Sequence, residues 1–363
     1  MLVEYYFPQS LSAARLDRYL SGGWFRSGPS LFRAHLLCLE GELYSVVNIR
    51  VVLDELKLSR SLRKVLNRGN RNFQVVIGRA QVDEAREALY VQHKTRFKGF
   101  IFDSLEEFLF GGVSHYLFDT HEVAVYDKGE LVAISYFDRG ENGIASLIGL
   151  YQDGYERYSL GLFTMLHEVQ FGQTLGHRFY YPGYVLKGYD GFDYKLRLGN
   201  IQYYNWNGRW RPLDRISEEE FSSERLKKAI FTAEAHLKAY QVAHRRIIYP
   251  FFSVGYLGMV QDDFIRSAMF LEIRPGGESS PEVLVIEYIL EDEVYQISRV
   301  DTNRDYMDFI DANFSEDFFS WENSQTGLYI REERLFSHYN IEPIIQFLLR
   351  NLPSYHPSKG HSL

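Results

Sequence analysis

The sequence predicts an α+β fold, in which helices flank a mixed sheet and an extra α+β module follows it. Three strand-like stretches succeed one another at Val123–Tyr126, Leu131–Phe137 and Ile144–Leu150, and the turn Asp127–Gly129 joins the first two. Apolar runs separated by tight turns indicate an antiparallel meander. Beyond Pro250, further strand-like runs and an acidic stretch mark the separate module.

A chain of 363 residues is long enough for two or three domains. We expect an N-terminal α+β domain over 1–88, the mixed-sheet domain over 89–215, a linking helix over 216–249 and the additional α+β module over 250–363. Within the first domain, Ala13, Leu16 and Leu20 recur on one helical face and predict a helix.

The rest of the N-terminal half alternates between strand and helix patterns. Residues 24–39 and 44–52 are typical of hairpin strands, and residues 82–97 and 105–109 are typical of helices. These two helices lead into the meander.

A basic helix is expected between those elements. Ser59 can cap it, and Gly69 is expected to end it after about Asn67. The stretch Lys57–Arg71 holds six basic residues and no acidic one. Four of them share one flank, namely Arg60, Arg63, Lys64 and Arg68. This flank is either a solvated surface or a face that contacts phosphates.

After the meander, Ser159–Leu175 is typical of a helix and Arg178–Tyr181 of a strand. Residues 193–198 and 202–206 are expected to be strands, the second followed by the hairpin turn Asn207-Gly208.

In the C-terminal half, Ser217 and Glu220 form a capping-box pattern before a long amphipathic helix. Strands are expected over 268–273, 283–290 and 294–300, and a helix is expected over 341–352.

Composition restricts the class of protein. The formal net charge is −8 and residues 278–322 alone carry −11, so the remainder sums to about +3 and a local basic face is possible.

A single cysteine, Cys38, excludes a disulfide framework within the chain and a multi-cysteine metal site. The N-terminus has no signal-peptide pattern, and no run approaches the roughly 18 apolar residues that span a bilayer. We therefore expect a cytoplasmic protein.

The order of meander, helix and strand resembles the N-acetyltransferase (GNAT) fold, in which the last strand splays from its neighbour and an acyl donor sits in the opening. Several stretches also resemble the arginyl-tRNA–protein transferase family and its bacterial leucyl relatives. In chain order they are Gly23–Gly28, Leu31–Arg33, Ser59–Leu66, Leu131–Ala133 with Asp138, Tyr151 with Ser159–Gly161, Tyr180–Tyr184, and Tyr194-Lys195. The resemblance covers roughly the first 215 residues.

The chain departs from the family pattern at three places. The family's cysteine cluster is reduced to Cys38, so a metal or iron–sulfur role there is lost. The family's Arg-His pair after the tyrosine near Tyr90 is present only as a loose His93–Arg96. Pro182 replaces an aliphatic residue in the tyrosine motif.

The resemblance implies transfer of an aminoacyl group, Arg or Leu, from the 3′ ester of a tRNA to the α-amine of a protein that begins with Asp or Glu. It implies no dissociable cofactor, and because the cysteine cluster is reduced to Cys38 we expect no metal. The ester is already activated, so positioning and stabilisation of the oxyanion matter most.

Four residues are expected to be catalytic. Asp138 or Glu168 can accept the amine proton, although Asp138 equally fits a turn cap and Glu168 a helix surface. Because Pro182 has no N–H, the oxyanion contact of that strand is expected from Gly183 or Tyr184.

Seven further residues are expected to bind substrate: Tyr151, Ser159, Gly161, Tyr181, Tyr194, Lys195 and Arg197. Ser159 and Gly161 open a helix whose free N–H groups can bind a phosphate or carbonyl oxygen, or else Ser159 caps the helix and Gly161 permits close packing. The tyrosines either stack on the terminal adenine or fill the core. Lys195 or Arg197 can pair with the acidic side chain of the acceptor. The basic flank would contact tRNA phosphates.

Two other functions fit the same pattern. The first is an acyl-CoA-dependent N-acetyltransferase, although Arg157–Leu162 lacks the spacing of a pyrophosphate-binding loop. The second is a non-catalytic adaptor that retains the fold, which the C-terminal module and the reduced cysteine cluster suggest.

Overall fold

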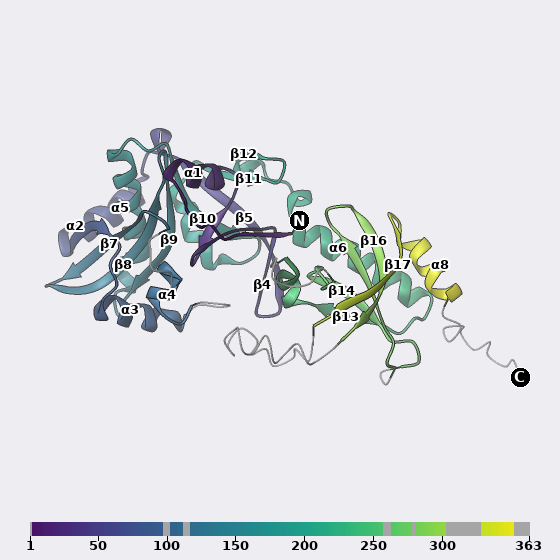
Figure 1. Ribbon diagram of the computed structural model, residues 1–363. Coiled ribbons are helices and arrows are strands. Elements are labelled where there is room, and N and C mark those ends of the chain that lie inside the picture. Colours follow the sequence, from purple (N-terminus) through teal and green to yellow (C-terminus); the bar gives the residue numbers. More distant parts are fainter. Residues whose placement is uncertain are drawn as a thin grey trace, which may run out of the picture. The chain divides into compact units, whose positions relative to one another are not determined.

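The computed structural model describes residues 2–96, 102–111, 117–256, 263–277, 280–302 and 328–351. They form two compact units (Figure 1). The core unit comprises Tyr5–Arg33 and Val46–Ser217, and the C-terminal unit comprises Met1–Glu4, Ala34–Ser45 and Glu218–Leu363. The division into four parts stays a prediction.

The core unit is built on a mixed sheet with the strand order β12-β11-β5-β10-β9-β8-β7-β6. The strands are β5 (Glu42–Val52), β6 (Gln74–Arg79), β7 (Thr120–Asp127), β8 (Glu130–Arg139), β9 (Gly143–Tyr151), β10 (Phe179–Leu186), β11 (Ile201–Asn205) and β12 (Arg209–Pro212), and β4 (Leu36–Leu39) pairs with the start of β5. The strands β1 (Val3–Tyr6), β3 (Ser30–Ala34) and β2 (Phe25–Ser27) form a small separate sheet.

The predicted meander is confirmed, because β7, β8 and β9 pair antiparallel in sequence order. Helix α5 (Leu160–Thr174) follows, and β10 then returns parallel to β9. The observed fold is therefore α+β with a mixed sheet, as expected.

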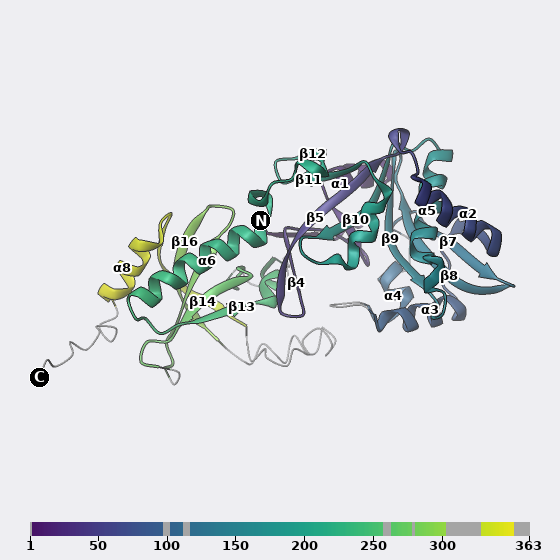
Figure 2. The same ribbon diagram turned by 180° about the vertical axis from the view of Figure 1, so that it is seen from behind.

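Helices cover both faces of the meander (Figures 1 and 2). Helix α5 is buried on most of its circumference and lies on one face, with α2 (Arg60–Asn72) packed outside it. Helices α3 (Glu84–Lys94) and α4 (Leu105–Phe110) pack on the opposite face around Ile134 and Tyr136. Helix α1 (Ala13–Ser21) packs beside β9 and β10.

The basic helix begins as predicted, since the Ser59 hydroxyl accepts the Leu62 N–H at 3.3 Å. Its predicted end at Gly69 is wrong. Gly69 lies inside α2 because the helix packs closely on α5, where a Cβ on Gly69 would come within 2.2 Å of the Phe163 ring. The glycine therefore serves helix packing rather than helix termination.

Two other local expectations are wrong. Residues 193–198 belong to a 3-10 helix, η3 (Asp190–Leu198), instead of a strand. The expected start of the long helix at Ser217 is wrong, because residues 218–220 form a short 3-10 turn and α6 (Ser222–Ala239) starts after Phe221 without a side-chain cap.

The C-terminal unit holds an antiparallel sheet with the order β13-β14-β15-β16-β17, on which α6 and α8 (Ile341–Asn351) pack. The predicted strands are β14 (Met269–Ile273), β15 (Val283–Ile289) and β16 (Val294–Asp301). The outer strands β13 (Arg245–Ile248) and β17 (Ile330–His338) were not predicted, because their exposed charged residues hide the apolar alternation. Across the described ranges, no helix has the length and apolarity to cross a membrane.

Candidate functional site

An opening separates β9 from β10 in the middle of the core sheet. The two strands pair only at Phe179–Tyr181, opposite Gly143–Ala145. Beyond that point β10 continues along β5, with Gly183 opposite Ile49. In such a ladder alternate N–H groups point to opposite sides of a strand. Some backbone donors of β10 after Tyr181 therefore point toward the opening.

A β-bulge marks the start of the opening. The register of β10 against β5 shifts between Tyr180 and Gly183, and Pro182 lies within the shift. Proline cannot donate to the ladder, so a bulge accommodates it. Gly183 then adopts φ +91°, a conformation that L side chains rarely adopt.

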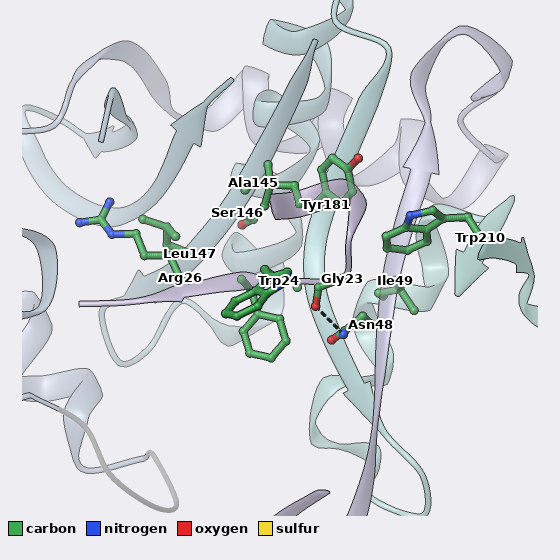
Figure 3. Close-up of a pocket in the computed structure, with 13 residues that line it drawn as sticks. Gly23, Trp24, Arg26, Asn48, Ile49, Ala145, Ser146, Leu147, Tyr181 and Trp210 are labelled. Atoms are coloured by element: carbon green, nitrogen blue, oxygen red, sulfur yellow. Dashed lines mark hydrogen bonds between the residues drawn. The ribbon is translucent and has the colours of Figure 1, made fainter. Parts of the chain in front are cut away.

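A small cavity of about 20 Å³ lies at this opening, with room for about one water molecule (Figure 3). Its lining is mostly apolar and comes from α1, the segment after it, β2, β5, β9, β10 and β12. It consists of Leu20, Gly23, Trp24, Phe25, Arg26, Asn48, Ile49, Ala145, Ser146, Leu147, Tyr181, Gly183 and Trp210. The Asn48 side chain on β5 donates to the Gly23 carbonyl oxygen at 2.7 Å and connects β5 to the segment after α1.

Glu168 lies on α5, behind the opening. Its side chain is fully buried, and the Tyr180 hydroxyl donates to Oε2 at 2.7 Å. Burial raises the pKa of Glu168 to about 7, against the opposing effect of the hydroxyls of Ser135, Tyr180 and Ser146. The other carboxylate oxygen, Oε1, has no hydrogen-bond partner. A carboxyl group with this pKa can exchange a proton near neutral pH.

Ser146 connects Glu168 to the cavity. It is one of the lining residues, and its hydroxyl interacts with both Tyr180 and Glu168. The pKa of Tyr180 is raised well above its usual value by burial and by Glu168, so its hydroxyl remains a proton donor at neutral pH. The side chains of Ser146, Tyr180 and Glu168 thus form a polar path from the cavity into α5.

Asp138, the other predicted proton acceptor, is held in a buried ion pair. Arg26 Nη1 lies 2.7 Å from Oδ1, and the Thr120 hydroxyl donates to the same oxygen at 2.7 Å. Arg26 also donates to the Gly28 carbonyl oxygen and lies 4.0 Å from the centre of the Phe118 ring. Burial raises the pKa of Asp138 and lowers that of Arg26, while their ion pair opposes both shifts. These contacts fix the β2–β3 hairpin to β8.

The two carboxylates lie on opposite faces of the sheet. Phe137 packs against Phe171 of α5 at 5.4 Å between ring centres, so the next residue, Asp138, points to the other face. Glu168, which belongs to α5, therefore lies on one face of the sheet, and Asp138 points to the other face.

Lys195 and Tyr184 cover the other side of the opening. Lys195 Nζ donates to the Tyr184 carbonyl oxygen at 3.1 Å and lies 4.9 Å from the Phe192 ring centre. Burial lowers the pKa of Lys195 to about 8. Its Nζ would lie 3.5 Å from a Cβ on Gly183, so the ammonium group sits directly beside the bulge.

The remaining predicted substrate residues on η3 are more open to solvent. Tyr194 is 41% exposed and Arg197 is exposed. Tyr181, by contrast, is buried against α1 and lines the cavity. The structure thus brings Tyr181, Gly183 and Lys195 together but leaves Arg197 outside.

Tyr151, Ser159 and Gly161 lie near the start of α5. The Arg96 guanidinium lies 4.7 Å from the Tyr151 ring centre. Ser159 adopts a left-handed conformation with φ +56° and makes no capping bond with its side chain. A Cβ on Gly161 would meet nothing within 4 Å, so close packing does not require this glycine. Anion binding by the N–H groups of this helix end stays a prediction.

The basic flank of α2 is only partly free. Arg60, Arg63 and Lys64 are exposed. Arg68 instead donates to the Arg157 carbonyl oxygen at 2.6 Å and lies 5.4 Å from the Tyr158 ring centre. Since Arg157 and Tyr158 belong to the turn η2 (Glu156–Tyr158) that precedes α5, the basic flank adjoins the start of that helix.

Comparison with known proteins shows the family to which this part of the chain is similar. A family model described as "Arginine-tRNA-protein transferase, C terminus" matches residues 79–205, which contain β9, α5, β10 and η3. The aspartate/glutamate leucyltransferase of Xanthomonas axonopodis pv. citri is 31% identical over 176 residues, which cover 46% of this chain and 69% of that protein. The chain belongs to the aminoacyl-tRNA–protein transferase family.

The transferase also has more distant relatives. The aspartate/glutamate leucyltransferase of Leptospira interrogans (strain Fiocruz L1-130) is 23% identical over 199 residues, which cover 53% of this chain and 76% of that protein. Among solved structures, L-PGS from Bacillus licheniformis is similar at a TM-score of 0.31 and 16% identity, over 39% of this chain and 48% of that one. That likeness is too weak to carry a functional conclusion.

Sequence reasoning missed several residues of the site in this transferase. Arg26 was noted only within the Gly23–Gly28 motif, although its burial makes it the partner of Asp138. Ser146 lies in an apolar strand pattern, where one serine gives no signal. The contribution of Trp210 to the cavity depends on β11 and β12 pairing beside β5, and no local pattern shows this.

Proposed function

We propose that this transferase moves a leucyl group from charged tRNA to the N-terminal amine of a protein that begins with Asp or Glu. The observation that carries the proposal is the cavity at the β9–β10 opening, connected through Ser146 and Tyr180 to Glu168, whose pKa is about 7. This arrangement offers an acyl site with backbone donors on one side and a proton acceptor on the other.

The cavity itself holds only about one water molecule, enough for the ester carbonyl oxygen, and the mostly apolar residues around it favour a leucyl over an arginyl side chain beside the opening. Apart from Arg26, the lining residues are uncharged, and they include Trp24, Leu147 and Trp210. An arginyl side chain among them would lack a carboxylate partner, because the Arg26 guanidinium already pairs with Asp138, and burying an unpaired charge is unfavourable. The names of the relatives from Xanthomonas and Leptospira point to the same amino acid.

In the proposed reaction the acceptor amine attacks the ester carbonyl carbon of the charged tRNA. The C–N bond forms, the ester C–O bond breaks, and the ribose oxygen leaves. The α-amine has a pKa of about 7.7–8.0, so roughly a tenth of it is neutral at pH 7. The amine proton passes through Ser146 and Tyr180 to ionised Glu168 and is then returned to the ribose oxygen.

The tetrahedral oxyanion is stabilised by backbone donors of β10 at Gly183 or Tyr184, where the strand faces the opening. Lys195 adds positive charge next to this position. Asp138 acts by holding Arg26 and the cavity wall at β2 rather than by accepting the amine proton.

The tRNA is held along α2 and the start of α5. Arg60, Arg63 and Lys64 contact phosphates of the acceptor stem, and the uncapped N-terminus of α5 receives an oxygen of the 3′ end. The tyrosines beside the opening receive the terminal adenine, with exposed Tyr194 and partly exposed Tyr151 as the stacking surfaces.

A transfer assay tests the proposal. The enzyme is incubated with Leu-tRNA or Arg-tRNA and with peptides that begin with Asp or Glu, and labelled product is counted. We expect transfer from Leu-tRNA, and at most weak transfer from Arg-tRNA. Efficient arginyl transfer would overturn the amino-acid assignment. Tight acetyl-CoA binding in calorimetry, with no transfer from either tRNA, would favour the acetyltransferase alternative.

A further inference from the structure

Arg50 on β5 lies between two aromatic rings next to the cavity. Its guanidinium carbon is 4.1 Å from the Phe179 ring centre and 4.5 Å from the Trp210 ring centre. Nε donates to the Gln202 side-chain oxygen at 2.8 Å. Two rings and one amide thus fix the plane of the guanidinium. Its Nη groups are the donors that remain besides Nε, and the Tyr181 hydroxyl lies next to the guanidinium.

No carboxylate balances this cation in the part of the chain that the structure describes, since Arg50 forms no ion pair there. The charged side chain that lowers its pKa, Arg178, has the same sign. Arg178 lies 5.1 Å from the same Phe179 ring and lowers the pKa of Arg50, as burial does. Two guanidinium groups around one ring, without an acidic partner, create a half-buried position that favours an anion.

Arg50 is one side chain away from the proposed reaction centre. Trp210 and Tyr181 both line the cavity, and the Tyr181 hydroxyl interacts with the Arg50 guanidinium. An acceptor whose α-amine reaches the opening would therefore bring the side chain of its first residue toward this guanidinium.

We infer that Arg50, framed by Phe179 and Trp210, binds the side-chain carboxylate of the acceptor's first residue. The inference rests on the proposed function and names the residue that recognises the first side chain of the acceptor protein. A planar guanidinium binds a carboxylate through two parallel hydrogen bonds, which a lysine cannot reproduce. This gives Arg50 the role that the sequence pattern suggested for Lys195 or Arg197.

Peptide competition tests the inference. The enzyme and its Arg50→Gln and Arg50→Lys variants receive Leu-tRNA and an equimolar pair of peptides that begin with Asp and Asn, and in a second series with Glu and Gln. Because both peptides compete for the same enzyme, the product ratio does not depend on how much protein is folded. Arg211→Gln, an exposed arginine on β12, is the matched control.

We expect the unchanged enzyme to prefer the acidic peptide of each pair. Arg50→Gln should reduce that preference about 10- to 100-fold through a higher KM for the acidic peptide, the scale of a charged hydrogen-bonded pair. Arg50→Lys should keep part of the preference, and Arg211→Gln should keep all of it.

A different pattern would overturn the inference. If Arg50→Gln slows transfer to acidic and amide peptides equally, the residue supports the fold or the tRNA instead of reading the acceptor. If the unchanged enzyme transfers leucine to acidic and amide peptides alike, no carboxylate is read at all. Absence of transfer by the unchanged enzyme to any peptide would instead refute the proposed function itself.

Discussion

Asp138 and Glu168 are both fully buried in the core unit, on opposite faces of one sheet, yet their surroundings differ. Asp138 is paired with Arg26 and Thr120. Among the residues that the structure describes, Glu168 has hydroxyl neighbours and no ion-pair partner, and its second carboxylate oxygen accepts no hydrogen bond. One carboxylate is thus held in an ion pair, whereas the other can change its charge near neutral pH.

The difference between these two sites shows that the hydrogen-bonding or ion-pair partner of a buried carboxylate determines its role. An ion pair offsets part of the cost of burying the charge and makes the group a structural link. Hydroxyl partners offset less, so the pKa rises and the group becomes available for proton transfer. Five expected outcomes, beginning with the largest effect, test this contrast and the tRNA-binding surface proposed beside it.

Arg26→Ala should destabilise the protein by about 3–5 kcal/mol, because it leaves Asp138 buried without its cation. Urea unfolding measures the change. Arg139→Ala is the matched control, since its ion pair with Asp119 is partly exposed and is worth less than about 1 kcal/mol. Equal effects of the two substitutions would contradict a structural role for the Arg26–Asp138 pair.

Glu168→Gln should lower kcat by about 100- to 1000-fold while the fold persists, because the proton acceptor is lost. Activity of the unchanged enzyme should rise as the pH passes through about 7, where Glu168 ionises. Steady-state transfer at several pH values measures both effects, with Glu84→Gln on the exposed side of α3 as control. Unaltered turnover in the Glu168 variant would exclude it as the base.

The same substitution has a consequence for stability. The folded pKa of Glu168, about 7, lies above its ordinary value of 4.5, so the folded state holds a proton that the unfolded state has lost between these pH values. Stability from this group is complete below about pH 4.5, falls by on the order of 3 kcal/mol as the pH rises to about 7, and is constant above. Glu168→Gln should remove this decline, which urea unfolding at pH 5 and pH 8 can detect.

Reversing two charges on α2, in an Arg63→Glu, Lys64→Glu variant, should weaken tRNA binding about tenfold. The slope of the logarithm of the binding constant against the logarithm of the salt concentration should fall by about two, because two phosphate contacts are lost. Filter binding at several salt concentrations measures the slope. Arg350→Glu, on α8 of the C-terminal unit, should leave the slope unchanged. A normal slope in the double variant would remove α2 from the tRNA-binding surface.

Tyr180→Phe gives the smallest expected effect. It removes one hydrogen bond to ionised Glu168, so the pKa of Glu168 should rise by about half to one unit. The ascending limb of the pH–rate profile should then move to higher pH by the same amount. An unmoved profile with reduced kcat would show that Tyr180 does not set the pKa of Glu168.

Much of the local structure could be predicted from the sequence. The alternation over β7, β8 and β9 gave the meander, and Ser59 gave the start of α2. The outer strands β13 and β17 could not be predicted, because charged residues interrupt their apolar alternation. The end of α2 was mispredicted at Gly69 for a different reason, because this glycine allows close packing against Phe163 in a helix far along the chain.

The candidate site was predicted less completely. Glu168 was among the expected residues, but its spacing on a helix could not distinguish a buried carboxylate from one on the surface. Asp138 could not be recognised as an ion-paired residue, since Arg26 lies 112 positions away in sequence. Ser146 and Arg50 carry no local pattern that separates them from ordinary strand residues.

The sequence alone determined the family, the mixed α+β fold and the position of the proline in β10, because these depend on ordered motifs, local periodicity and the missing N–H of one residue. The tertiary structure decided which charges are paired and which titrate, where β9 and β10 separate, and which aromatic rings surround Arg50. Those properties depend on burial and on partners from distant segments, and a pKa is set by both.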